Sequence, residues 1–202
     1  CEAHLGKGRN PEWEKNHHHQ PHYVYLALTN SVKVGVTRED QIPTRWIDQG
    51  AHKGILLAKT PYRQLAGFIE VVLKEHLSDK TNWQRMLKNE ASLISDLLAE
   101  KNRVIDLIPE DYRQYRHIED EIIELIYPVL EYPAKVSSLS FEKMPEINME
   151  LTGIRGQYLL FRGGFVFNVR KNSGYELALI CRCPTISFPS IRFRSLRSRI
   201  PS

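Results

Sequence analysis

Two short runs of β-branched, aromatic and aliphatic residues, separated by a turn, constrain this chain more than any other stretch. The first run covers residues 23–29, and in the second, 32–37, valines alternate with polar or small residues. Alternation with a period of two predicts a strand with one buried face. Thr29, Asn30 and Ser31 between the runs are typical of a tight turn. The sequence therefore predicts an antiparallel hairpin, in whose second strand Gly35 allows a partner to approach closely.

Helical patterns follow the predicted hairpin. A helix that carries Arg45 begins after a proline, which suits a first turn. The apolar run 55–58 predicts a third strand. The clearest helix covers about 61–77, with apolar side chains at helical spacing and Glu70 beside the centre of that stripe. We therefore expect an α+β domain over 23–108, with a three-stranded sheet and flanking helices.

From residue 109 onward the pattern changes from helical to β. Short β-rich runs alternate with glycine-containing turns, a spacing typical of a small barrel or sandwich. We expect such a β-rich domain over 109–181 and a basic, disordered tail over 182–202. The tail holds five arginines and no acid, so the net charge of +4 says little about the folded part. Contact between the tail and nucleic acid is the alternative to simple disorder.

Composition argues against several classes of protein. Three cysteines are too few for a disulfide scaffold, and no run of about 18 apolar residues is present to span a bilayer. The start is charged rather than apolar, unlike a signal peptide. We therefore expect a reduced, cytoplasmic protein that does not contact a membrane. The sequence leaves the oligomeric state open, and because the chain begins with Cys1 we expect further residues upstream.

The first 22 residues are polar and rich in histidine. Zinc is held by four cysteine or histidine donors arranged as a tetrahedron. The candidate zinc ligands in the segment 1–22 are Cys1, His4, His18 and His22. A solvent-exposed histidine run without a resident metal is the alternative.

The order of these elements resembles the GIY-YIG nuclease superfamily. Tyr25 stands at the tyrosine of the first motif, and Lys33–Gly35 stand where the second motif would be. Arg45, Glu70 and Asn82 follow in the order of the superfamily's arginine, metal-binding glutamate and asparagine. The resemblance implies a GIY-YIG-like core and Mg²⁺-dependent cleavage of phosphodiester bonds in DNA or RNA.

The residue types suit that chemistry. Glu70 can hold the divalent ion that offsets charge on the phosphate. The guanidinium of Arg45 can clamp two phosphate oxygens, and Tyr25 can help to activate water. In this hypothesis Tyr25, Arg45 and Glu70 are catalytic. The residues expected to contact phosphate are Lys33, Arg38 and Asn82.

Two motif positions depart from the superfamily. Tyr23 replaces the first glycine, and Lys33 replaces the second tyrosine, which changes the proton chemistry. The alternative function is therefore a non-catalytic nucleic-acid-binding module on the same scaffold, and a third is a protein-interaction domain. The structural alternatives are a core aromatic for Tyr25, a solvated strand residue for Lys33, an ion pair with Asp48 or Glu39 for Arg45, an ion pair with Lys74 for Glu70, and a helix cap for Asn82.

A longer part of the sequence is similar to a bacterial domain family of unknown function. The similarity lies in 25–29, 33–38, 44–51 and 80–83 and reaches about residue 180. The members that it resembles are cytoplasmic, Bacteroidetes-type proteins with zinc-ribbon cysteines upstream of the point where this chain starts. The resemblance implies that Cys1 is a late member of that cysteine set and that His18 replaces another.

Overall fold

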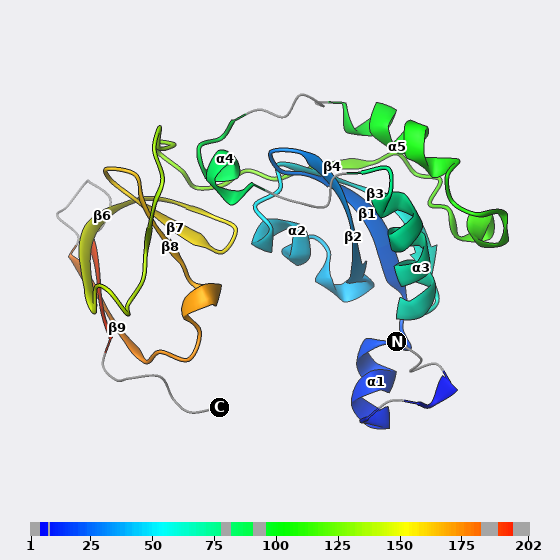
Figure 1. Cartoon of the computed structure of the whole chain (residues 1–202), viewed down its shortest axis with the longest axis horizontal. Coiled ribbons are helices and arrows are strands. Elements are labelled where there is room, and N and C mark those ends of the chain that lie inside the picture. Colours follow the sequence, from blue (N-terminus) through cyan, green and yellow to red (C-terminus); the bar gives the residue numbers. More distant parts are fainter. Residues whose placement is uncertain (1–4, 8, 78–81, 91–95, 183–189, 196–202) are drawn as a thin grey trace. The chain divides into compact units, whose positions relative to one another are not determined.

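The computed structural model describes residues 5–7, 9–77, 82–90, 96–182 and 190–195 (Figure 1). It confirms a mixed α+β protein, and its contacts divide the chain into two units. The N-terminal unit comprises residues 1–82 and 91–125, and the C-terminal unit comprises 83–90 and 126–202. None of the helices in the described ranges is long and apolar enough to cross a membrane.

The N-terminal unit consists of one sheet with helices around it. Its helices are α1 (Pro11–His17), α2 (Thr44–Asp48), α3 (Arg63–Lys74) and α5 (Leu97–Ile105), with 3₁₀ turns η2 (Glu39–Gln41) and η3 (Glu110–Tyr115). Its strands are β1 (His22–Leu28), β2 (Val32–Arg38), β3 (Lys53–Thr60) and β4 (Ile122–Glu124). The strand order is β2-β1-β3-β4, and β1 is antiparallel to both of its neighbours.

All seven residues of β1 are buried, because this central strand is covered on both faces. Val24, Leu26 and Leu28 point into a core formed with the apolar stripe of α3 and with α5. Burial of one such aliphatic side chain contributes about 1.5–3 kcal/mol. Tyr25 and Ala27 point to the other face, where they pack with Trp46 of α2. The predicted hairpin and the helix over about 61–77 are confirmed.

Two glycines make room for aromatic rings on that second face. Gly35 pairs with Tyr25 across the β1–β2 ladder. A Cβ atom at Gly35 would lie 2.6 Å from the phenol oxygen of Tyr25. A Cβ atom at Gly54 on β3 would likewise lie 2.5 Å from Cε3 of the fully buried Trp46. The Tyr25 ring therefore occupies the space that a side chain at position 35 of β2 would need, and the Trp46 ring occupies the space that a side chain at position 54 of β3 would need.

The C-terminal unit is built on a longer sheet. Its strands are β5 (Ser137–Leu139), β6 (Glu146–Arg155), β7 (Tyr158–Phe161), β8 (Phe165–Asn168), β9 (Leu177–Arg182) and β10 (Ser190–Ser195), and its helices are α4 (Trp83–Leu87) and the 3₁₀ turn η4 (Arg170–Asn172). The order is β5-β8-β7-β6-β10-β9. The long strand β6 pairs with β10 through its first half and with β7 through its second half.

A buried arginine explains why 83–90 belongs to this second unit. Arg155 is fully buried, and its Nη1 donates a 2.9 Å hydrogen bond to Oδ1 of Asn89. Its guanidinium also lies 5.5 Å and 5.6 Å from the ring centres of Tyr127 and Tyr132. The hydrogen bond to Asn89 and the stacking of Trp83 on Tyr158 attach the segment 83–90 to the sheet.

Three features differ from the sequence-based expectation. The first sheet has four strands rather than three, because 122–124 pairs with β3 and keeps 109–125 in the N-terminal unit. The expected barrel is not closed: across the described residues β5 and β9 are the two edges of an open sheet. Residues 190–195 of the expected disordered tail form β10, whereas 183–189 and 196–202 lie outside the described residues.

Gly35→Ala should lower the free energy of unfolding by about 1–3 kcal/mol, because the new methyl group overlaps the Tyr25 ring. Urea unfolding measures the change. Gly67→Ala is the matched control, since a Cβ atom at this α3 position meets nothing within 4 Å. There alanine should stabilise by about 0.5–1 kcal/mol through helix propensity. Equal effects of the two substitutions would contradict the proposed packing.

Candidate functional site

One pocket of the N-terminal unit brings together four residues singled out from the sequence. Its volume is about 190 Å³, and side chains from β1, β2, α2 and α3 line it. The lining residues are Tyr25, Lys33, Val34, Gly35, Val36, Arg45, Gln49, Glu70 and Lys74. We call this the Glu70 pocket. It places the three predicted catalytic residues and the predicted phosphate contact Lys33 around one concavity.

Tyr25 is held at the base of this pocket. Nε2 of Gln49 donates a 2.9 Å hydrogen bond to its phenol oxygen. Burial raises the pKa of Tyr25 above its ordinary value, although the hydrogen bond from Gln49 and the charge of Arg45 act in the opposite direction. Tyr25 therefore keeps its proton at neutral pH and can donate a hydrogen bond into the pocket. Tyr25 is also a buried core aromatic, as the structural alternative expected, and its catalytic role stays a prediction.

Lys33 is half-buried on the edge strand β2, opposite Ala27. Burial, with a smaller contribution from the positive charge of Arg45, lowers the pKa of Lys33 from 10.5 to about 8. The structure therefore does not place Lys33 as an ordinary solvated strand residue. An ammonium group with this pKa can bind an anion or exchange a proton near neutral pH.

Glu70 reaches the pocket from α3 and is the one carboxylate among the lining residues that the structure describes. An ion pair of 3.2 Å joins it to Lys74 one helical turn later, as one interpretation of the sequence expected. Three cations, Lys33, Arg45 and Lys74, therefore surround a single acid. This excess of positive charge favours an anionic group such as phosphate.

Arg45 lines the Glu70 pocket, and Glu39, one of the two acids that the sequence suggested as its partner, pairs with other residues. Glu39 instead accepts from Lys59 at 2.6 Å and from the hydroxyl of Tyr23 at 3.3 Å. Arg45 lies near Tyr25 and Lys33, whose pKa values its charge lowers. Its guanidinium therefore belongs to the pocket rather than to a surface ion pair with Glu39.

Two of the predicted phosphate contacts, Arg38 and Asn82, do not line the Glu70 pocket. Arg38 lines a neighbouring pocket and forms a 3.3 Å ion pair with Asp40. Asn82 is exposed directly before α4 and does not line the Glu70 pocket. The predicted phosphate contact at Asn82 therefore receives no support from the geometry.

The predicted zinc ligands fall into two groups. Cys1 and His4 lie outside the described residues. His18 and His22 line the same pocket as Arg38 and Arg63. Burial and then the charge of Arg63 lower the pKa of His18, and burial lowers that of His22 despite a hydrogen bond to the Gln20 carbonyl. In the described ranges no cluster of three or more metal-binding side chains occurs, and the zinc site stays a prediction.

The sequence interpretation missed Gln49, which lines the Glu70 pocket, and Arg63, which lines the neighbouring pocket, and helical spacing would have revealed both. Gln49 lies four residues after Arg45, one helical turn along the same face. Arg63 lies seven residues before Glu70 on α3, again on one face. Neither residue belongs to the motif pattern, so only its position on a helix relates it to the site.

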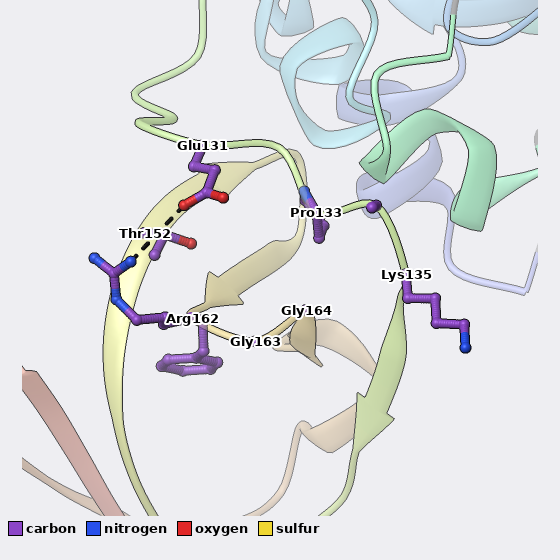
Figure 2. A pocket seen from close by; sticks show the side chains of 9 residues that line it. Glu131, Pro133, Lys135, Thr152, Arg162, Gly163 and Gly164 are labelled. Carbon is purple, nitrogen blue, oxygen red and sulfur yellow. Dashed lines mark ion pairs between the residues drawn. The ribbon is translucent and has the colours of Figure 1, made fainter.

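A different pocket lies in the C-terminal unit, with a volume of about 330 Å³ (Figure 2). Its prominent cation, Arg162, forms hydrogen bonds of 2.5 Å and 2.7 Å to the carboxylate of Glu150. An additional ion pair of 3.8 Å joins Arg162 to Glu131. Lys135 also lines this pocket, and Figure 2 shows its side chain directed away from Arg162. Because two carboxylates compensate the charge of Arg162, this pocket is a weaker candidate for binding an anion than the Glu70 pocket.

Lys33→Met should raise the free energy of unfolding by about 1 kcal/mol near pH 7 in the absence of metal. The lowered pKa means that the folded state holds the proton of Lys33 less tightly than the unfolded chain does. The charged lysine therefore reduces stability fully below about pH 8, and the loss disappears as the pH rises toward 10.5.

Urea unfolding near pH 7 and near pH 9.5 tests this prediction, and the gain should be larger at the lower pH. Lys15→Met is the control, because Lys15 is exposed on α1 and its loss should change stability by less than about 0.5 kcal/mol. A loss of stability in Lys33→Met near pH 7 would refute the argument.

Comparison with known proteins identifies one family. No curated protein and no solved structure matches the chain. The family described as "Protein of unknown function (DUF2797)" matches residues 1–177, which is most of the sequence. This match confirms the expected domain family of unknown function, while the Bacteroidetes origin and the GIY-YIG-like core stay predictions. The chain belongs to the DUF2797 family of proteins of unknown function.

Proposed function

We propose that this protein has a divergent GIY-YIG-like core and cleaves phosphodiester bonds of DNA or RNA with the help of a divalent metal ion. The observation that carries the proposal is the convergence of Tyr25, Arg45 and Glu70 on the Glu70 pocket. These residues are 20 and 25 positions apart in the sequence and come from a strand and two helices. The superfamily's motifs predict the order of these residues along the sequence. The fold brings the three side chains together in one pocket.

The residues present fit a magnesium ion better than a transition metal. Mg²⁺ uses one or two carboxylates, keeps several water ligands and shares substrate phosphates. Glu70 supplies one carboxylate. Oε1 of Gln49, which lines the same pocket, is buried and has no hydrogen-bond partner in the part of the chain that the structure describes. An oxygen of this kind suits the hydration shell of a hard cation.

Three polar side chains of the pocket then have roles toward a bound phosphate. A bound Mg²⁺ would offset the negative charge that develops on the phosphate. Arg45 would bind phosphate oxygens through its planar guanidinium. Tyr25, protonated and held by Gln49, would orient the attacking water or the phosphate by donating a hydrogen bond. Lys33 would contact the phosphate and exchange a proton near neutral pH.

A non-catalytic nucleic-acid-binding module is the second candidate. The ion pair between Glu70 and Lys74 favours it, because Lys74 already neutralises the carboxylate that a metal would need. In this case the cations of the pocket would bind the backbone, and Glu70 would only weaken that binding. The two candidates therefore predict opposite consequences of removing the charge of Glu70.

Glu70→Gln should reduce metal-dependent cleavage at least about 100-fold, the upper end of the loss caused by removing an outer-shell partner of a metal ligand. Labelled single- and double-stranded DNA and RNA, incubated with Mg²⁺ or Mn²⁺ and separated on a denaturing gel, provide the measurement. Glu75→Gln is the matched control, because this exposed carboxylate follows α3 and does not line the pocket.

Absence of cleavage with every substrate and both ions would reject the catalytic proposal. Binding that is weakened by salt and strengthened in Glu70→Gln, without cleavage, would establish the binding module instead. Equal loss of cleavage in Glu70→Gln and Glu75→Gln would show that the effect is not specific to the pocket.

A further inference from the structure

A second pocket borders the first and is lined by cations and aromatic rings. Its volume is about 370 Å³. The residues that matter for its chemistry are Trp13, His18, His22, Arg38, Arg45 and Arg63. We call it the histidine–arginine pocket. Three guanidinium groups face it, and none of its lining residues in the described ranges is a carboxylate, so the charges of that lining favour an anion.

The two pockets share a wall. Val36 of β2 and Arg45 of α2 line both of them. On α3, Arg63 belongs to the histidine–arginine pocket, while Glu70 and Lys74 belong to the Glu70 pocket. An extended anion lying across β2 would therefore meet Arg45 between the two sites. A nucleic-acid strand carries phosphates at regular intervals and can occupy two neighbouring anion sites at once.

The segment that closes this pocket is attached to the N-terminal unit by backbone contacts. The amide of Arg63 at the start of α3 donates a 2.9 Å hydrogen bond to the carbonyl of His18, directly after α1. The amide of Glu39 donates a 3.1 Å hydrogen bond to the carbonyl of Pro21. The residues directly after α1 are therefore attached to the start of α3 and to η2, which holds Trp13 of α1 at the pocket.

Trp13 gives the pocket an aromatic surface. It is 48% exposed, which is unusual for the largest apolar side chain. Its ring stacks on His17 with the centres 4.1 Å apart and only 9° between the planes. One indole face is thus supported by the imidazole. Aromatic rings beside a basic groove are the usual means of binding single-stranded nucleic acid, because every base can stack on them.

We propose that the histidine–arginine pocket binds the phosphate next to the one held in the Glu70 pocket, on a single-stranded nucleic acid whose base stacks on Trp13. This proposal rests on the proposed function, because that function makes the neighbouring Glu70 pocket a phosphate-binding site. Arg63 and Arg45 are the phosphate ligands. Arg38 is a weaker one, because Asp40 already pairs with it.

Binding of a fluorescein-labelled oligothymidylate of about 12 nucleotides, followed by anisotropy in EDTA so that no cleavage occurs, tests this proposal. Arg63→Gln should weaken binding about 3- to 10-fold and reduce the slope of log K against log salt by about 0.7, the value for one phosphate contact on a single strand. Arg63 is exposed, so the variant should fold. Trp13→Ala should weaken binding about fivefold or more with an unchanged salt slope, because stacking releases no counterions.

Lys15→Gln is the matched control, since it removes a positive charge from α1 at a position that does not line the pocket. The proposal is overturned if Arg63→Gln binds like the wild type, if Lys15→Gln is equally weakened, if Trp13→Ala has no effect, or if the wild type does not bind at low salt. Binding that depends on Arg63 without any cleavage would reject the proposed catalysis and leave this pocket standing. Cleavage that does not depend on Arg63 would support the proposed catalysis and reject the proposed role of this pocket.

Discussion

The close packing of the Tyr25 ring on Gly35 is the contact on which the candidate site depends. The two residues face each other across the β1–β2 ladder, and the missing Cβ atom of Gly35 leaves space for the ring. The phenol oxygen thereby reaches Gln49, one helical turn from Arg45. The pairing of Tyr25 with Gly35 therefore connects the edge strand β2, through Tyr25 and Gln49, to the end of the helix α2. The pocket forms where α2 packs on the face of β1 that carries Tyr25 and where β2 continues the sheet beside that strand.

The charges around β2 are unbalanced in a way that a purely structural site would not require. Three cations face one carboxylate in the Glu70 pocket, and Arg45 continues this charge into the histidine–arginine pocket. Half-burying Lys33 there costs stability, as its lowered pKa indicates. Residues that reduce stability in this way are common at functional sites. This balance of charge is the physical basis for proposing a phosphate ligand at both pockets.

Local patterns predicted the centre of the N-terminal unit well. The two strands of the hairpin and the long helix lie within a few residues of their predicted positions, because hydrophobic period and turn residues act over short distances. β4 and the assignment of 83–90 to the second unit were not predictable in this way. Both depend on partners far along the chain, such as β3 for β4 and Arg155 for Asn89. The open sheet of the C-terminal unit likewise depends on pairings between distant strands.

The sequence by itself determined which side chains could serve the site: an aromatic hydroxyl, a lysine, an arginine and a glutamate in motif order. It also determined the hairpin that carries Tyr25 and Lys33. The tertiary structure alone decided that Glu70 and Arg45 turn toward those strands, while Asn82 does not line their pocket. It also decided that the histidines near the start border arginines. The physical reason is that an apolar stripe predicts which face of a helix packs on the sheet, whereas the place of the helix along the sheet depends on partners far away in the sequence.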